Sequence, residues 1–156
     1  MTPLYEDNHI IIVNKAAGEI VQGDKTGDTP LSDIVKAYLK EKYNKPGEVF
    51  LGVVHRLDRP VSGVVVFAKT SKALTRLNEM FRKGEVHKTY HAIIPRLPKL
   101  TATVSPLLLT HYLTRNEKQN KAYAFAKEVQ GSKKATLDYL LLESSDRYAL
   151  LQVNLH

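Results

Sequence analysis

The alternation of short apolar runs with polar turns predicts a chain built mainly from buried strands. Residues 49–54 and 64–68 form runs that are short, rich in β-branched side chains and bounded by turn residues, as buried strands are. Between the two runs lies a polar turn, residues 55–63, which reads H-R-L-D-R-P-V-S-G. A polar turn between two core strands is firmly placed and open to a ligand, so this turn is the first candidate for a functional site.

The N-terminal third of the chain predicts two further strands and a helix. Residues 9–13 form an apolar strand pattern, and a short second strand is expected at residues 20–21. Thr29 supplies a capping hydroxyl and Pro30 suits the first helical position, so a helix is predicted to begin there. Apolar residues recur along it at helical spacing until residues 44–47 end it, which indicates a helix packed on a core.

The rest of the chain predicts one more helix and several strands. The helix runs from about Ser71 to Lys83, with Leu74, Leu77 and Phe81 expected to face inward and Gly84 as its stop signal. Residues 101–113 are expected to be irregular and residues 114–121 to form a polar loop, while residues 144–147 connect a hairpin. Strands are predicted at residues 87–94, 122–129, 135–143 and 148–155. The pattern indicates an α+β fold with more strand than helix.

Composition indicates one ordinary globular domain. At 156 residues we expect a single domain over residues 1–156, with no apolar run long enough to span a bilayer. The N-terminus lacks the basic start and apolar core of a signal peptide. Cysteine is absent, which excludes disulfides and thiolate metal ligands and suits a cytoplasmic protein. His and Asp show no metal-ligand spacing, so no metal is expected, and we expect a monomer.

The net charge favours a polyanionic partner. Lys and Arg number 23 against 16 Asp and Glu, which gives a formal charge of +7. A basic surplus of this size favours RNA or DNA through counterion release. The basic residues are spread along the chain, as on a basic face of a folded domain.

Asp58 is the residue of the polar turn with the most evident chemistry. Arg56, Arg59 and His55 surround it in sequence, and nearby cations favour the ionised carboxylate. An ionised carboxylate on a rigid turn can act as a nucleophile or as an electrostatic group. The alternative from charge pattern alone is an ion pair of Asp58 with Arg56 or Arg59 that pins the turn.

Three motifs in order resemble those of the RNA pseudouridine synthases of the large-subunit rRNA and tRNA type, the RluA-like family. H-R-L-D-x-x-x-S-G at residues 55–63 resembles the family's central signature. Residues 14–18, reading N-K-A-A-G, resemble its first motif, where proline more often replaces Ala16. Lys88-Thr89-Tyr90 resembles its K-x-Y motif. The resemblance implies the pseudouridine synthase fold, a mainly antiparallel mixed sheet flanked by helices.

The resemblance also implies an activity. Asp58 corresponds to the aspartate that attacks the target nucleotide while the N1–C1′ bond breaks; the uracil then turns and is rejoined through C5. This isomerisation needs no cofactor, and its substrate is structured rRNA or tRNA. Tyr90 corresponds to the residue that stacks on the flipped uracil. Arg56 corresponds to an arginine that fills the space of the flipped base and contacts the backbone.

Three further residues are candidates for RNA contacts. For His55 and Arg59, phosphate contacts and turn-stabilising hydrogen bonds are both open. For Lys15, an RNA contact and a solvated turn lysine are both open.

The resemblance also predicts that the chain is C-terminally incomplete. In the family, a strand like residues 150–155 runs into a T-G-R-x-H-Q-I-R-type segment whose basic residue pairs with the catalytic aspartate, whereas this chain ends at His156. The alternative function is therefore a non-catalytic RNA-binding protein or an inactive fragment of the same fold. A hydrolytic glycosidase is disfavoured because that class needs paired carboxylates.

Overall fold

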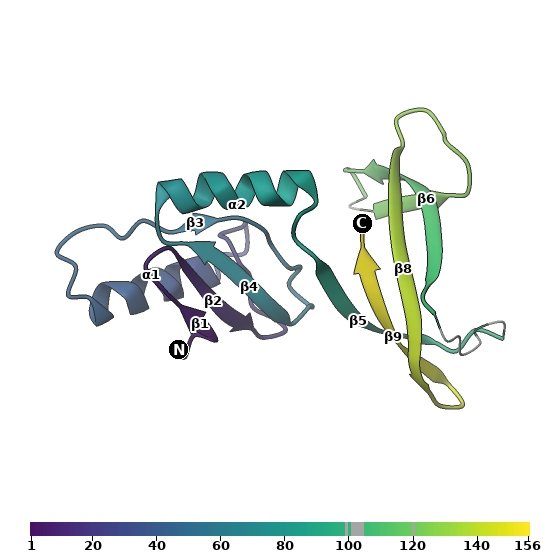
Figure 1. Cartoon of the computed structure of the whole chain (residues 1–156), viewed down its shortest axis with the longest axis horizontal. Helices are drawn as coiled ribbons and strands as arrows, with labels where there is room; N and C mark the ends of the chain where they lie inside the picture. The colour runs from purple at the N-terminus through teal and green to yellow at the C-terminus, as the bar shows by residue number, and fades with distance from the viewer. Residues whose placement is uncertain (99, 101–104, 120) are drawn as a thin grey trace. The chain divides into compact units, whose positions relative to one another are not determined.

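A computed structural model describes residues 1–98, 100, 105–119 and 121–156 of the chain (Figure 1). These residues form two compact units, Met1–Glu85 and Val86–His156. Each unit has its own β-sheet, and the two sheets share no described strand. Within the single domain expected over residues 1–156, the structure thus distinguishes two units.

The N-terminal unit is built on a four-stranded sheet in the order β1-β2-β4-β3, with every neighbouring pair antiparallel. Its strands are β1 (Tyr5–Glu6), β2 (Ile10–Lys15), β3 (Gly52–Val53) and β4 (Gly63–Ala68). The two central strands, β2 and β4, pair over their full length, from Ile10 opposite Ala68 to Lys15 opposite Gly63. This register brings the start of the first motif, Asn14 and Lys15, beside the end of the polar turn.

Two of the strands predicted for this unit differ in the structure. The strands predicted at residues 9–13 and 64–68 are confirmed by β2 and β4. Residues 49–54 contribute only the two residues of β3, and the strand predicted at residues 20–21 is wrong. The carbonyls of that segment instead accept hydrogen bonds, of 2.8 and 3.1 Å, from the first two N–H groups of the following helix. Those N–H groups have no partner within a helix, so the segment is used as a cap.

Two helices complete the unit: α1 (Leu31–Lys42) and α2 (Ser71–Lys83). α1 begins one residue later than predicted. Its N-cap is Pro30, which was predicted as the first helical residue, and no side chain caps it, so the predicted Thr29 cap is wrong. The Thr70 hydroxyl caps α2 by accepting from the Ala73 N–H at 3.1 Å. α2 ends as predicted at Gly84, whose φ of 72° is a left-handed conformation that glycine adopts without strain.

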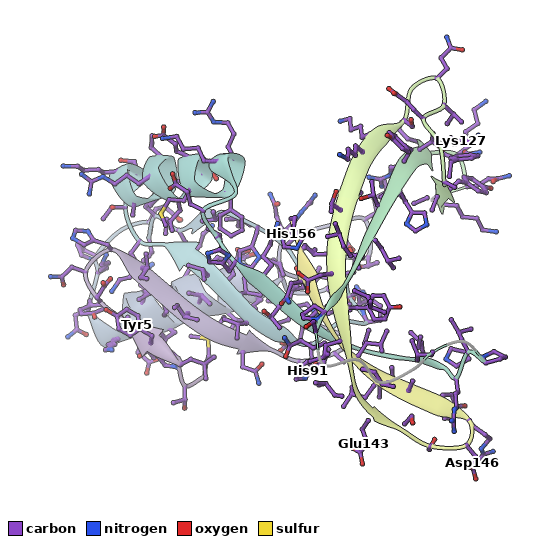
Figure 2. The ribbon with its side chains drawn as sticks, turned by 45° about the vertical axis from the view of Figure 1, so that its right-hand side comes forward. Tyr5, His91, Lys127, Glu143, Asp146 and His156 are labelled. Carbon is purple, nitrogen blue, oxygen red and sulfur yellow. The ribbon has the colours of Figure 1, made fainter. Side chains whose placement is uncertain are left out.

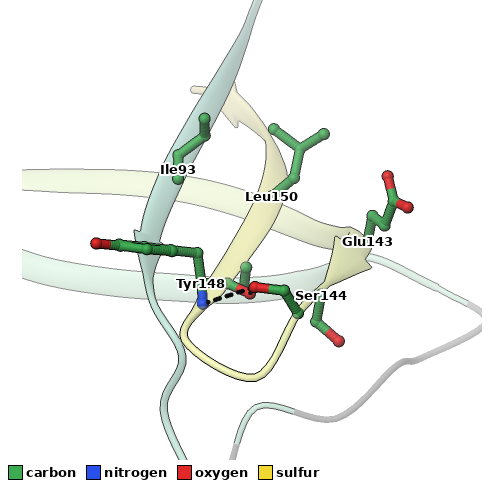
Figure 3. A pocket seen from close by; sticks show the side chains of 7 residues that line it. Ile93, Glu143, Ser144, Tyr148 and Leu150 are labelled. Carbon is green, nitrogen blue, oxygen red and sulfur yellow. Dashed lines mark hydrogen bonds between the residues drawn. The ribbon is translucent and has the colours of Figure 1, made fainter.

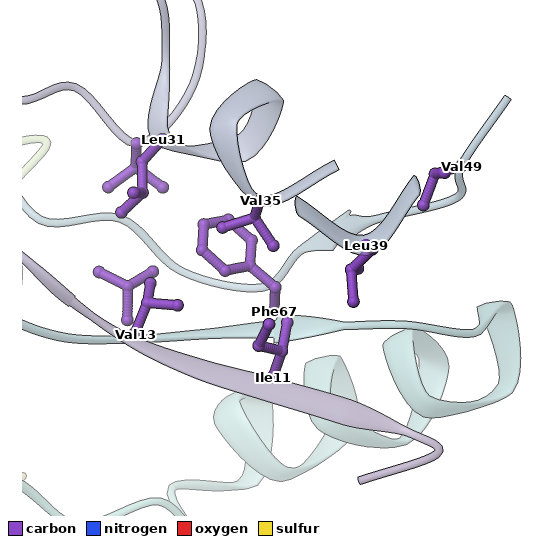
Figure 4. Packing of buried hydrophobic residues seen from close by; sticks show 9 residues of the cluster. Ile11, Val13, Leu31, Val35, Leu39, Val49 and Phe67 are labelled. Carbon is purple, nitrogen blue, oxygen red and sulfur yellow. The ribbon is translucent and has the colours of Figure 1, made fainter. Parts of the chain in front are cut away.

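The core of this unit lies between the sheet and α1, while α2 lies on the opposite face of the sheet (Figure 4). Leu31, Val35 and Leu39 are buried on one side of α1, four residues apart, and pack on Phe67 of β4. The remaining buried members of the cluster are Ile11, Val13, Val21, Val49 and Val65. A sheet held between two helices gives the loops at its edge a rigid base.

A buried carboxylate ties the edge strand β1 to the rest of the unit. The Glu6 side chain is only 6% exposed and accepts hydrogen bonds from Lys42 Nζ at 2.8 Å, Lys69 Nζ at 2.7 Å and Tyr43 Oη at 2.7 Å. Burial opposes ionisation of Glu6, but the bonds from Lys42, Lys69 and Tyr43 outweigh it and lower its pKa to about 2. Glu6 is therefore an ionised clamp between β1, α1 and the end of β4.

The C-terminal unit is a five-stranded antiparallel sheet in the order β5-β9-β8-β6-β7. Its strands are β5 (Lys88–Pro95), β6 (Leu107–Asn116), β7 (Lys121–Phe125), β8 (Lys133–Ser144) and β9 (Tyr148–Leu155). The strands predicted at residues 87–94, 135–143 and 148–155 are confirmed, and so is the hairpin connection between the last two. The α+β class, with more strand than helix, is confirmed as well.

Part of the region expected to be irregular is a strand. Residues 107–113 belong to β6, which continues to Asn116 and pairs with β8 on one side and β7 on the other. The run Leu107–Leu109 has no alternation of apolar and polar positions, so only the cross-strand partners reveal it as a strand. Residues 101–104 of the predicted segment lie outside the described residues. β7 ends at Phe125, four residues before the predicted end of that strand.

Candidate active site

The polar turn connects β3 to β4 at the edge of the N-terminal sheet (Figure 1). The Val61 N–H donates to the Asp58 carbonyl at 3.0 Å, which closes the turn. Arg56 and Asp58 are exposed, whereas Leu57 between them packs against the hydrophobic core. Gly63 has a φ of 142°, a conformation in which a residue with a side chain would be strained. This explains the glycine at this point. The turn thus presents Asp58 and Arg56 to solvent.

Lys15 anchors this turn from inside. Its side chain is 0% exposed, and Nζ donates to the carbonyls of Ala16 at 3.1 Å, Asp58 at 3.1 Å, Arg59 at 3.2 Å and Val61 at 2.5 Å. The structure therefore matches neither alternative considered for Lys15, since a fully buried ammonium is neither solvated nor placed to contact RNA. Its positive charge is satisfied by backbone dipoles, and it fixes the main chain on both sides of Asp58.

His55 holds the start of the turn. Its ring stacks on Phe81 of α2, with centroids 5.1 Å apart and planes at 22°. Its Nε2 accepts a hydrogen bond from the Val66 N–H of β4 at 3.1 Å, which requires that nitrogen to be unprotonated. Of the two roles open for His55, the structure contains the turn-stabilising hydrogen bond; the phosphate contact stays a prediction.

Arg59 holds the outer side of the turn. Its guanidinium pairs with the Asp28 carboxylate at 2.5 Å and donates to Thr26 Oγ1 at 2.9 Å, while its carbonyl accepts from the Gly18 N–H at 2.8 Å. Hydrogen bonds from the Thr26 hydroxyl and N–H lower the pKa of Asp24 in the same loop. Arg59 thereby joins the turn to residues 24–28, a turn-stabilising role; its phosphate contact stays a prediction.

The alternative that Asp58 pins the turn through an ion pair is not what the structure contains. Arg59 pairs with Asp28, and the Asp58 carboxylate forms no ion pair within the described part of the chain. The Asp58 main chain, by contrast, is held by the Lys15 ammonium and the Val61 N–H. A carboxylate that is exposed and unpaired, on a backbone that is fixed, is available to attack or orient a bound ligand.

Tyr90 belongs to the C-terminal unit. It is half-buried on β5, opposite Val153 of β9, which in turn lies opposite Tyr139 of β8. Directly paired residues of an antiparallel sheet share a face, so Tyr90 has an apolar and aromatic neighbourhood. Tyr90 is partly exposed on a regular strand, which is compatible with stacking of its ring on a planar ligand.

Two residues of this site were not predicted as site residues. Asp28 is not marked by any motif, and the loop offers Asp24 as an equal candidate partner for Arg59. Phe81 was predicted to face inward from its helical spacing, but its stacking on His55 depends on how α2 packs on the sheet. The sequence offered one signal for each residue. Arg59 in the turn needed an acidic partner, and Phe81 lies on the helix face that was expected to point inward.

A small cavity lies elsewhere, at the β8–β9 hairpin of the C-terminal unit (Figure 3). Its volume is about 220 Å³. The residues that line it are Ile93, Glu143, Ser144, Ser145, Tyr148, Ala149 and Leu150. Two of these lining residues are joined by a hydrogen bond, in which the Tyr148 N–H donates to Ser145 Oγ at 3.1 Å. The site residues predicted from the sequence do not line this cavity.

Neither a metal cluster nor a membrane helix is present among the described residues. No group of three or more His, Asp or Glu side chains there could hold a metal ion. No described helix is long and apolar enough to cross a membrane.

Comparison with known proteins gives the chain its family. Residues 9–156 match the family model described as RNA pseudouridylate synthase. The chain is 38% identical over 117 residues to ribosomal large subunit pseudouridine synthase C of Buchnera aphidicola subsp. Schizaphis graminum, which covers 74% of this chain and 35% of that protein. It is 32% identical over 136 residues to tRNA pseudouridine synthase C of Vibrio cholerae, which covers 87% of this chain and 51% of that protein.

The structural comparison agrees. The solved structure titled human RNA Pseudouridylate Synthase Domain Containing 4 superposes with a TM-score of 0.76 at 22% identity, and covers 98% of this chain and 58% of that one. The fold is therefore that of the pseudouridylate synthase domains, a class of isomerases. The chain belongs to the RNA pseudouridylate synthase family, and the RluA-like resemblance of its motifs is confirmed. It spans about a third to a half of the length of these two curated relatives.

Proposed function

We propose that this chain carries the catalytic aspartate of an RNA pseudouridine synthase that isomerises uridine to pseudouridine in rRNA or tRNA. The names of its relatives, which are ribosomal large-subunit and tRNA enzymes, support this substrate class. The net charge of +7 suits a polyanionic substrate. The reaction rearranges atoms within one nucleotide, so it consumes no cofactor.

Asp58 is the proposed nucleophile. Its carboxylate attacks the target nucleotide as the N1–C1′ glycosidic bond breaks. The uracil turns and C5 bonds to C1′, the bond between Asp58 and the nucleotide breaks to restore the carboxylate, the C5 proton leaves and N1 gains one. An ionised carboxylate on a fixed backbone reduces the entropic cost of reaching that geometry. The observation that carries the proposal is that the Asp58 main chain is held by Lys15 Nζ at 3.1 Å while its carboxylate is exposed.

Two further residues are proposed to handle the flipped uridine. A uracil within a stacked helix is out of reach of a carboxylate, so the nucleotide must leave the stack. Tyr90 is proposed to stack on the extruded uracil, and its partial exposure on β5 supports this role. Arg56 is proposed to fill the vacated space and contact the backbone, since a planar guanidinium can stack and donate hydrogen bonds at once.

The test is pseudouridine formation by purified wild-type chain and Asp58→Asn on RNA from cells that lack the gene. We expect the wild type to introduce pseudouridine at one or a few sites, and Asp58→Asn to abolish it while RNA binding persists, because asparagine keeps the shape and loses the nucleophile. Asp146→Asn is the matched control, since it makes the same chemical change at an exposed aspartate in the connection between β8 and β9 (Figure 2). Activity retained by Asp58→Asn would contradict the assignment. RNA binding by the wild type without product would favour the non-catalytic alternative.

A further inference from the structure

Aromatic and lysine side chains gather on one face of the sheet formed by β6, β7 and β8. β6 is the middle strand: its Tyr112 lies opposite Phe125 of β7 and also opposite Lys134 of β8. Two residues further along β6, Thr114 lies opposite Tyr123 of β7. Two residues further again, Asn116 lies opposite Lys121. We call this set the aromatic–lysine face; its members are Tyr112, Lys121, Tyr123, Phe125 and Lys134.

The register places these five side chains on the same side of the sheet. Directly opposed residues of an antiparallel pair share a face, and residues two apart in a strand do so too. Lys133 lies opposite Leu113, so it belongs to the other face although it adjoins Lys134 in sequence. Two lysines that differ by one position thus lie on opposite faces of one strand.

Two of the three rings of this face are open to solvent, and the third, that of Tyr112, is half-buried. Tyr123 is 43% exposed and Phe125 is 39% exposed, and both lysines are exposed. The Tyr123 hydroxyl donates to Gln119 Oε1 at 2.8 Å, which restrains the ring of Tyr123. Because β7 is an edge strand, a ligand can approach the rings from the face and from the edge.

The charge around these rings favours an anionic ligand. Residues 112–134 contain six Lys and Arg residues against two Glu residues; Arg115 and Lys133 lie on the other face of the sheet, and the aromatic–lysine face itself carries Lys121 and Lys134. Exposed aromatic rings interleaved with cations on a sheet match what single-stranded RNA requires, since bases stack on aromatic faces and phosphates pair with lysine. A protein partner is disfavoured because lysine is depleted in protein–protein interfaces, whereas Lys121 and Lys134 belong to this face.

We propose that the aromatic–lysine face binds a single-stranded stretch of RNA. Bases stack on Tyr123, Phe125 and the neighbouring Tyr112, while Lys121 and Lys134 pair with phosphates. The inference rests on the proposed function in that the substrate is RNA, and it adds a site for an unpaired segment of that substrate on strands that carry none of the residues predicted to act on the uridine.

The test is fluorescence anisotropy of the full 156-residue chain with a labelled 12-nucleotide oligouridine. We expect Phe125→Leu and Tyr123→Leu each to weaken binding by about fivefold to a hundredfold, because leucine keeps the apolar bulk and loses the stacking surface. Lys134→Gln should weaken binding and reduce the slope of log affinity against log salt by about 0.7. Lys133→Gln is its matched control, and Tyr148→Leu, at the other end of the sheet, is the aromatic control; we expect both to bind nearly as the wild type does.

The outcomes separate this inference from the proposed function. Circular dichroism and thermal midpoints equal to the wild type's establish that each variant is folded. Three outcomes would each overturn the inference: unchanged affinity of the aromatic variants, equal losses from Lys133→Gln and Lys134→Gln, or no oligouridine binding by the wild type. The last of these is the result expected if the face binds a protein instead. If the wild type forms pseudouridine while the face variants bind normally, only the inference fails. If the face variants lose binding but the wild type forms no pseudouridine, only the proposed function fails.

Discussion

Replacing Lys15 by methionine tests whether the buried ammonium fixes the catalytic turn. Methionine has nearly the length of lysine and no charge, so Lys15→Met removes the four bonds from Nζ with little change in volume. Within β2 the side chain stays at the same position opposite Gly63. The change therefore isolates the interaction between the ammonium and the turn carbonyls.

The expected cost follows from what each carbonyl retains. The carbonyls of Ala16, Asp58 and Arg59 also accept from backbone N–H groups, at 3.4, 3.0 and 2.8 Å respectively. For the Val61 carbonyl, the ammonium at 2.5 Å is the partner that the structure describes. One lost charge-assisted bond costs about 1.5–3 kcal/mol, and relief from burying a charge offsets smaller losses at the other three. We expect the turn to be destabilised by about 2–3 kcal/mol.

Hydrogen–deuterium exchange of single amides measures how often the destabilised turn unfolds locally. The Val61 and Gly18 N–H groups donate within the anchored region, so their exchange reports local unfolding of the turn. A cost of 2–3 kcal/mol corresponds to exchange about 30- to 150-fold faster. Pseudouridine formation should fall as well, because Asp58 loses its fixed position.

The control is Lys45→Met, which removes an exposed lysine near the end of α1. It makes the same chemical change without touching the turn, and we expect its exchange at Val61 to equal the wild type's. Exchange in Lys15→Met no faster than in Lys45→Met would refute the reasoning that the ammonium holds the turn.

Three more predictions concern the second unit, the β1 clamp and the end of α2. Tyr90→Ala should strongly reduce the rate of pseudouridine formation in a single-turnover assay, and a normal rate would remove Tyr90 from the site. Since the pKa of Glu6 lies at about 2, below its usual 4.5, its contribution is fully present above about pH 4.5 and is lost as pH falls towards 2. Glu6→Gln should cost about 2–3 kcal/mol of unfolding free energy at pH 7, and its difference from wild type should shrink over that window in urea titrations; a constant difference would contradict the clamp. Gly84→Ala should lower the unfolding free energy by about 1 kcal/mol, because alanine is strained at a φ of 72°, and an unchanged urea midpoint would contradict this.

Local patterns predicted the regular elements well and the short ones poorly. The helix at residues 71–83 has apolar residues at helical spacing and a stop glycine, and both signals are confirmed, whereas its Thr70 cap was not predicted. Residues 20–21 look like a strand because they are apolar, yet their carbonyls cap α1, a use that depends on a helix ten residues away. β6 was partly missed because its leucine run lacks alternation, and only pairing with β7 and β8 makes it a strand.

The candidate site shows the same division between local and distant information. Asp58 and Arg56 were identified from a motif, and both are exposed on the turn as a functional role requires. The partners of the turn were not identified, because an ion pair is decided by distances in space and not by neighbours in sequence. Asp58 adjoins Arg59 in the chain, but Arg59 pairs with Asp28, 31 residues away.

The sequence by itself determined the family, the α+β class and the carboxylate that carries the proposed chemistry, because motifs and periodicity are properties of neighbouring residues. Tertiary structure alone decided the role of Lys15. A lysine in a glycine turn reads as solvated, but the full pairing of β2 with β4 places it beneath the carbonyls of residues 58–61. Its charge can be buried there because those carbonyl dipoles replace water, and such a cage exists only when two segments more than forty residues apart are brought together.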